Sequence, residues 1–507
     1  MPPTLARRYL VKLAANIVSV PVYLVMEALL PRALGPASYG NYSFATSLFQ
    51  QLSGFLDMGT STCLYNSLSR RQQETGLLAF YFRIALLVGL FTALLGLLML
   101  WPRAGKVLMP DVPLWLGPLA ALWAFLTWAG RVLRSVNDAL GATIASEIWR
   151  SVLSLSGALA LVLLFWRDSL NLTSLFAQQY LLLGATALAY WHVAKAHWQG
   201  EALAPRMSLE RKELESYKKE FFEYSHPLFV QALLSFGMLT AERWLLQWFD
   251  GSLQQGFFAL SQKVGMACFL FVSAMTPLLM REFSIAWGNG DKKAMALLLD
   301  RFAPLLYALA AYFSCFTMVE GRSLVEIFGG EQFLAATLPV QIMALYPLHQ
   351  AYGQIAGSIF HASGKTRILR NVAALECVYG LALAWLMVAP AHFGGLNLGA
   401  TGLAIKTVSA QMFTVNLYLF LASRFIPIGF WKNALHQFVC VILFSALALL
   451  ARELSSLFIN IAFFWRFCLS GVIYSFLVLG LCVLFPYAAG LSRQQLREFA
   501  RRFKTWL

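Results

Sequence analysis

Runs of about 20 mostly apolar residues follow one another along almost the whole chain, separated by short polar turns. A helix needs roughly 20 such residues to cross the ~30 Å hydrocarbon core of a membrane. The composition agrees, since 59% of the 507 residues are hydrophobic and only 12% are charged. The sequence therefore predicts an all-α, polytopic membrane protein with about 14 transmembrane helices. The predicted spans are residues 11–31, 39–62, 78–101, 113–133, 142–165, 173–194, 226–249, 256–280, 303–320, 334–360, 368–390, 399–422, 435–451 and 463–486.

The positive charge of the chain is concentrated in every second loop. The 39 Lys and Arg residues outnumber the 24 Asp and Glu residues, which gives a net charge of +15. Most of these basic residues fall on the side of the membrane that holds the N-terminus. Because cytoplasmic loops carry an excess of Lys and Arg, we expect both termini in the cytoplasm. Nucleic acid is not expected as a partner, since the basic residues form no continuous face.

An internal repeat relates two parts of the chain at an offset of 216 residues. The segment LLPRALGPASYGNY, residues 29–42, aligns without a gap with LLQWFDGSLQQGFF, residues 245–258. Each copy has two leucines, two glycines and a following aromatic residue at the same spacing, and each forms the predicted outer turn between two helices. Glycine permits a tight turn at such a point. Two copies with six spans each predict two pseudo-symmetric six-helix lobes, followed by two extra C-terminal helices.

The repeat and the polar segments divide the chain into four predicted regions. Between the lobes, residues 209–224 mix charges of both signs with aromatic residues, which is typical of an amphipathic helix at a membrane surface. A second amphipathic segment is predicted in the cytoplasmic tail. The predicted regions are 1–195, the N-terminal lobe; 196–225, the linker; 226–424, the C-terminal lobe; and 425–507, two additional helices and the tail.

No sequence pattern typical of a catalytic or metal centre is present. The chain lacks the glycine-rich loop with Lys and Ser or Thr that binds nucleotide phosphates. It also lacks the nucleophile elbow of hydrolases and Cys and His residues at metal-ligand spacing. We therefore expect no enzyme activity, no cofactor and no metal ion.

Several predicted spans contain ionisable residues, although a charge at the centre of a membrane helix costs about 2.5–3.5 kcal/mol. Such residues face a partner or a water-filled cavity. Glu27 and Arg243 occupy equivalent positions of the repeat and are predicted at matching depth. Arginine and lysine at these depths suit an anionic cargo, such as a phosphate or an acidic sugar, while structural interhelical ion pairs stay open as the other interpretation. The predicted cavity residues are Arg243, Glu27, Lys263, Lys406 and Glu376.

Three motifs resemble those of Wzx-type polysaccharide flippases, in the multidrug, oligosaccharidyl-lipid and polysaccharide exporter superfamily. They are ALGPASYGNYSFATSL at residues 33–48, the proline-led segment at residues 225–264, and HASGKTRILRN at residues 361–371. The resemblance implies an inner-membrane flippase that moves an undecaprenyl-diphosphate-linked oligosaccharide, a repeat unit of O-antigen, capsule or exopolysaccharide, by alternating access. It implies lipid-linked oligosaccharide and membrane lipid as partners, together with a polysaccharide polymerase and a chain-length regulator.

Two other functions remain open at this stage. A drug or cation antiporter of the same superfamily predicts an acidic cavity, whereas the charges in these spans are mixed. A polytopic membrane glycosyltransferase or polymerase needs a large outer loop or clustered outer carboxylates. The outer loops here are short and their acidic residues are dispersed, so the sequence favours the flippase.

Overall fold

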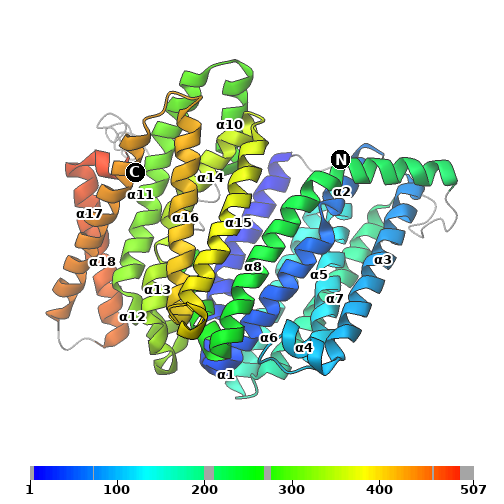
Figure 1. The fold of residues 1–507 in the computed structure, drawn as a ribbon, viewed down its shortest axis with the longest axis horizontal. Helices are drawn as coiled ribbons and strands as arrows, with labels where there is room; N and C mark the ends of the chain where they lie inside the picture. Colours follow the sequence, from blue (N-terminus) through cyan, green and yellow to red (C-terminus); the bar gives the residue numbers. More distant parts are fainter. Residues whose placement is uncertain (1–4, 72–73, 199–209, 268–275, 459–461, 491–507) are drawn as a thin grey trace. The chain divides into compact units, whose positions relative to one another are not determined.

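The computed structural model describes residues 5–71, 74–198, 210–267, 276–458 and 462–490, and within these it is all-α, without a strand (Figure 1). The chain divides into two compact units, Met1–Gly256 and Phe257–Leu507. This division falls inside the segment that the sequence assigns to the second lobe. The predicted tail at residues 492–507 lies outside the described residues.

The N-terminal unit contains seven complete helices and most of an eighth. The long helices run alongside one another, with α5 packed between α3 and α7, and with α6 against α1 and α7. Its elements are α1 (Leu5–Asp57), α2 (Thr60–Arg70), α3 (Thr75–Leu100), α4 (Pro102–Leu108), α5 (Leu116–Ala139), α6 (Thr143–Trp166), α7 (Leu172–His197) and α8 (Arg211–Ala267), the last of which continues into the second unit.

The C-terminal unit is built around α11, which packs on α14 and on α17, so that the additional helix α17 shares a core with the helices before it. Tyr307, Tyr352 and Phe444 are fully buried in this core. Its elements are α10 (Thr276–Gly288), α11 (Lys292–Val319), α12 (Gly321–Gly329), η1 (Glu331–Ala336), α13 (Thr337–Met343), α14 (Tyr346–Ala362), α15 (Thr366–Val388), η2 (Ala391–Phe393), α16 (Gly399–Ser423), α17 (Phe430–Ser456), α18 (Phe463–Leu484) and η3 (Pro486–Ala489).

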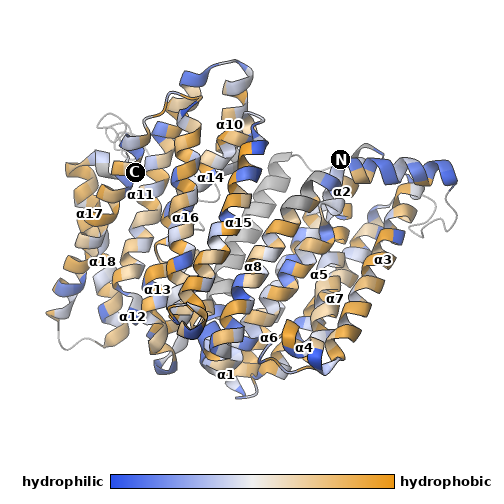
Figure 2. Cartoon of the chain, in the orientation of Figure 1, coloured by the Kyte–Doolittle hydropathy of each residue, from blue (hydrophilic) through white to orange (hydrophobic). Residues whose placement is uncertain are grey.

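Eight helices of the described residues are long and apolar enough to cross a membrane, namely α3, α5, α6, α7, α11, α15, α17 and α18. Their ribbons are drawn largely in the hydrophobic colours (Figure 2). Five of the other six predicted spans fall on α1, α2, α8, α13–α14 and α16, and the sixth, 256–280, includes residues 268–275, which lie outside the described residues. These helices carry Glu27, Arg243, Lys263, His349 and Lys406. The multi-pass, all-α fold predicted from the sequence is confirmed.

The repeat is visible in the backbone. Helix α1 is interrupted at Gly35, with φ 72° and ψ 168°, and α8 is interrupted at Gly251, with φ 74° and ψ −175°. This combination of dihedral angles is essentially restricted to glycine. The two residues are separated by the repeat offset of 216, so both copies place the same kink at the same position.

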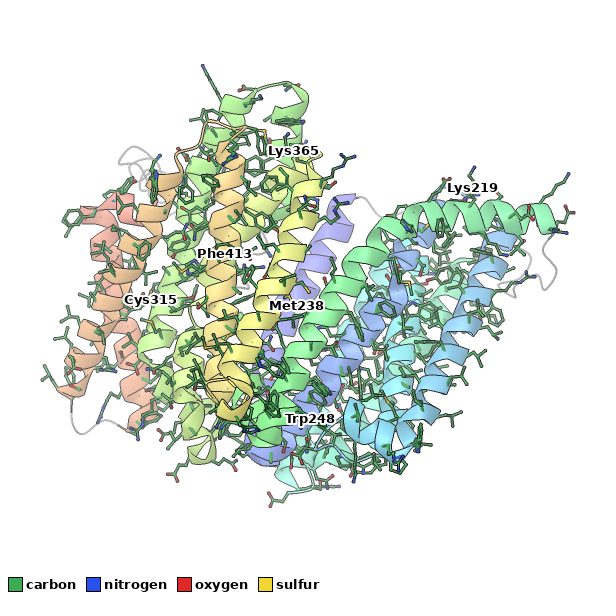
Figure 3. The ribbon with its side chains drawn as sticks, viewed as in Figure 1. Lys219, Met238, Trp248, Cys315, Lys365 and Phe413 are labelled. Atoms are coloured by element: carbon green, nitrogen blue, oxygen red, sulfur yellow. The ribbon has the colours of Figure 1, made fainter. Side chains whose placement is uncertain are left out.

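The first part of α8, residues 211–224, is the predicted linker helix, and it bends away from the rest of α8 (Figure 1). Its charged side, with Lys219, lies outward (Figure 3). Its other side is docked on the N-terminal unit, where the ring of Phe221 lies 5.2 Å from that of Phe80. Arg71 donates hydrogen bonds of 2.7 and 2.8 Å to the two carboxylate oxygens of Glu220. This hydrogen bond to Glu220 raises the pKa of Arg71 above its ordinary value.

Replacing Phe221 with alanine is expected to lower the free energy of unfolding by about 3–5 kcal/mol, because the ring is removed from a packed core. The Phe221 side chain is 4% exposed, whereas the neighbouring Phe222 is 67% exposed and provides a matched control. Melting of the purified protein in detergent should therefore occur at a lower temperature for Phe221→Ala and change little for Phe222→Ala. Equal shifts for the two variants would contradict the docking of the linker helix.

Candidate functional site

The two kinks of the repeat touch each other inside the N-terminal unit. A Cβ atom added to Gly40 would lie 1.8 Å from the carbonyl oxygen of Ser252. A Cβ atom added to Gly256 would lie 2.0 Å from the carbonyl oxygen of Pro36. Both pairs of equivalent residues are separated by 216 positions, so the contact is reciprocal. We call these four residues the crossing point.

Hydrogen bonds tie the segments beside the crossing point together. The side-chain amide of Gln247 donates to Asn41 Oδ1 at 3.2 Å, which joins α8 to α1. Asp111, in the loop before α5, accepts hydrogen bonds from the backbone nitrogen and the hydroxyl of Ser252, at 3.1 and 2.9 Å. The indole nitrogen of Trp244 donates to the carbonyl oxygen of Val107 at 2.6 Å. The second copy of the repeat is thus anchored both to the first copy and to the segment between α3 and α5.

A buried polar cluster lies between the two first helices of the repeat. The Tyr39 hydroxyl donates to Glu27 Oε2 at 3.2 Å, and Tyr39 is 1% exposed. Arg243, from α8, is 8% exposed and interacts electrostatically with Tyr39 and with Glu242. The equivalent positions 27 and 243 therefore both interact with one phenol group.

Sequence reasoning missed Tyr39. The available signal was its place immediately before Gly40, where the first copy of the repeat approaches the second. The cluster of Glu27, Glu242 and Arg243 holds two carboxylates and one guanidinium.

The other three predicted cavity residues belong to the C-terminal unit. Lys406, on α16, is 2% exposed. Glu376, on α15, lies within electrostatic range of Tyr379 and Tyr418. Lys263 is half-buried in the last part of α8. The predicted residues are thus divided between the two units, and a single cavity formed by all five stays a prediction.

A second charged cluster lies between α5 and α6. Glu147 is 1% exposed, and Arg150, three residues later on α6, approaches its Oε2 atom to 2.8 Å. Arg134, from α5, donates a hydrogen bond to Glu147 Oε1. Residues three apart share a helix face, so Glu147 and Arg150 form an ion pair within α6. The additional arginine was missed because it comes from another helix.

The described residues contain no group of three or more His, Cys, Asp and Glu side chains that could hold a metal ion. The two charged clusters consist instead of carboxylates, guanidinium groups and a phenol. Such groups bind and orient charged cargo, or stabilise helix contacts, by hydrogen bonds and ion pairs.

Comparison with known proteins identifies a family that the chain matches. A family model described as polysaccharide biosynthesis protein matches residues 5–278. No curated protein matches the chain significantly.

Three solved structures illustrate the likeness of the fold. An inward-facing multidrug resistance MATE family transporter of the MOP superfamily has a TM-score of 0.62 at 13% identity, covering 80% of this chain and 93% of that one. The lipid II flippase MurJ, in an inward closed conformation, has a TM-score of 0.62 at 13% identity, with 92% and 98% covered. A MOP superfamily transporter from Pyrococcus furiosus has a TM-score of 0.52 at 14% identity, with 83% and 94% covered. At these identities the comparison shows the fold alone.

Proposed function

Because the chain belongs to the family of polysaccharide biosynthesis proteins, we propose that it is a flippase for a lipid-linked oligosaccharide. Its proposed cargo is a repeat unit of O-antigen, capsule or exopolysaccharide, carried on undecaprenyl diphosphate. It would move this cargo across the bacterial inner membrane without changing it chemically, with both termini in the cytoplasm. A polysaccharide polymerase and a chain-length regulator are the proposed protein partners.

The observation that carries the proposal is the reciprocal contact at the crossing point. The two copies of the repeat have their kinks at equivalent residues, Gly35 and Gly251. Each copy can therefore adopt the conformation of the other when the contact at the crossing point rearranges. Parallel repeats of this kind give transporters two openings that are closed alternately. We infer that the crossing point closes the outer opening, because the predicted topology places both kinks outside.

The proposed binding groups for the diphosphate are Arg243, Lys263 and Lys406. A guanidinium binds a phosphate through two parallel hydrogen bonds, and an ammonium group adds a point charge. Glu27 and Glu376 would orient these groups or bind sugar hydroxyls. The oligosaccharide would occupy the interior of the protein while its lipid chain stays in the bilayer.

A second candidate function is transport of an organic cation. The specific observation in its favour is the excess of carboxylate at Glu27 and Glu242 over guanidinium at Arg243 in the N-terminal unit. A cationic cargo would be attracted to such a cluster, whereas a diphosphate would be repelled unless the lysines of the other unit outweigh it.

Depletion of the protein distinguishes the two functions. If it is a flippase, lipid-linked oligosaccharide should accumulate in the inner leaflet, and the surface polysaccharide should disappear until the gene is restored. If it exports cations, depletion should instead increase sensitivity to cationic drugs and leave the polysaccharide unchanged. Purified protein in liposomes, supplied with fluorescent lipid-linked oligosaccharide, provides the direct measurement. Unchanged surface polysaccharide together with no translocation in liposomes would reject the flippase.

A further inference from the structure

The cluster of Arg134, Glu147 and Arg150 is separate from the predicted cavity residues. Both arginine side chains remain 32% exposed, while the side chain of Glu147 is only 2% exposed. A buried carboxylate thus holds two guanidinium groups at the surface of the N-terminal unit. Each guanidinium carries five N–H donors, and with about a third of each side chain accessible, acceptor oxygens outside the helices can reach both groups.

The depth of the cluster suits the headgroup region of a membrane. Arg134 lies five residues before the end of α5 and Arg150 seven residues after the start of α6. At 1.5 Å per residue, these positions are ~7.5 Å and ~10.5 Å from the helix ends. Long arginine side chains at such depths reach the polar headgroups. The helix ends are joined by a short turn at residues 140–142, so both arginines are near the same side of the membrane.

The net charge around this cluster does not by itself favour an anion. Arg134, Arg150, Glu147 and Asp138 all act electrostatically on the buried Tyr190, so they share one neighbourhood. Two positive and two negative groups leave this neighbourhood close to neutral. Recognition of an anion would therefore depend on the N–H fork of each planar guanidinium, a geometry that suits phosphate oxygens.

We propose that Arg134 and Arg150 bind the phosphate group of a lipid. The lipid chain would lie along α6, which exposes Ile148, Val152 and Leu159 with 54%, 50% and 61% of their surface accessible. Because the connection at residues 140–142 is predicted to be cytoplasmic, this is a site on the inner leaflet. That the bound lipid is the carrier of the cargo, on undecaprenyl diphosphate, rests on the proposed function; the phosphate site itself does not.

Native mass spectrometry of the full chain in detergent tests the site. The probes are undecaprenyl diphosphate and phosphatidylglycerol, added separately at equal concentrations. Arg150→Gln, in which Glu147 keeps Arg134 as its partner, is expected to weaken lipid binding roughly 10- to 150-fold, as for the loss of one charge-assisted hydrogen bond. Arg150→Lys should also weaken it, since the charge is kept but the planar fork is lost. Arg167→Gln, at the other end of α6, is the matched control and should bind as the unmodified protein does.

Preference for undecaprenyl diphosphate would assign the site to the cargo carrier, and equal binding of both lipids would assign it to membrane phospholipid. Both results support a lipid phosphate site, provided that Arg150→Gln weakens the binding. Unchanged binding in Arg150→Gln, or an equal loss in Arg167→Gln, would overturn it. Translocation in liposomes is measured in parallel. If lipid binding depends on Arg150 but no translocation occurs, the flippase function is rejected and the lipid phosphate site is supported. If translocation occurs but Arg150→Gln leaves lipid binding unchanged, the flippase function is supported and the lipid phosphate site is rejected.

Discussion

Replacing Gly40 with alanine is expected to abolish or strongly reduce transport. The new methyl group would lie 1.8 Å from the carbonyl oxygen of Ser252, far inside any possible contact distance. Since the obstacle is backbone, a side chain cannot move aside, and α1 and α8 would have to separate. Overpacking of this kind costs about 1–3 kcal/mol, which lowers the population of the closed crossing point roughly 5- to 150-fold.

Gly256→Ala should have the same effect, because its Cβ would lie 2.0 Å from the carbonyl oxygen of Pro36. The double variant should be little worse than either single variant, since both disrupt one contact. Gly54 and Gly237 are matched controls on α1 and α8, as a Cβ atom there meets nothing within 4 Å. Their alanine variants should transport normally. Translocation is measured at matched protein levels in liposomes, and normal activity of well-folded Gly40→Ala would refute the role of the crossing point.

The kinks show what could be predicted from the sequence. Gly35 and Gly251 could be recognised as turn residues, because the backbone conformation at each kink is essentially restricted to glycine. The requirement is therefore visible in the sequence as two glycines at the repeat spacing. The close approach of Gly40 and Gly256 was not predictable in the same way. A glycine that is needed for space looks identical in sequence to one that is needed for its dihedral angles.

The charged residues show a different limit. Hydropathy identified Arg243 and Glu27 as residues that need partners, because a charge in an apolar span is costly. The position of the partner on the same helix was predictable for Arg150, since residues three apart share a helix face. Arg134 and Tyr39 come from separate helices or from beyond a kink, and only the packing brings them to Glu147 and Glu27.

The linker helix could be predicted only in part. Its alternation of charged and aromatic residues predicted an amphipathic helix, and residues 211–224 are helical. The surface that its apolar side covers was not predictable. Tyr217 and Phe221 pack on Phe80 of the N-terminal unit, whereas Phe222 stays exposed. An amphipathic pattern shows that a face will be covered, and only the folded structure identifies the covering surface.

Arg243→Ala is expected to abolish transport, and Arg243→Lys to weaken it. Arg243 is buried beside Glu242 and Tyr39, so its loss leaves buried carboxylate without its compensating charge, at a cost of about 3–5 kcal/mol. Lysine keeps the charge but cannot bind a phosphate through a planar fork. Arg32→Ala, at an exposed position of α1, is the control and should transport normally. Melting temperature and protein level must be measured together with translocation, because a variant that does not fold also fails to transport.

Exchange of the charges distinguishes a structural role from a binding role. In the double variant Glu27→Arg with Arg243→Glu, the two equivalent positions keep opposite charges. If the residues only stabilise contact between the first helices of the repeat, the exchange should restore both protein level and transport relative to Arg243→Ala. If Arg243 binds the diphosphate from α8, the exchange should restore protein level but not transport.

Tyr39→Phe removes the hydroxyl that donates to Glu27 and should cost about 0.5–1.5 kcal/mol of stability in the unmodified background. A well-folded Arg243→Ala protein with normal transport would remove Arg243 from the binding site, and the proposed cationic groups would then be limited to Lys263 and Lys406.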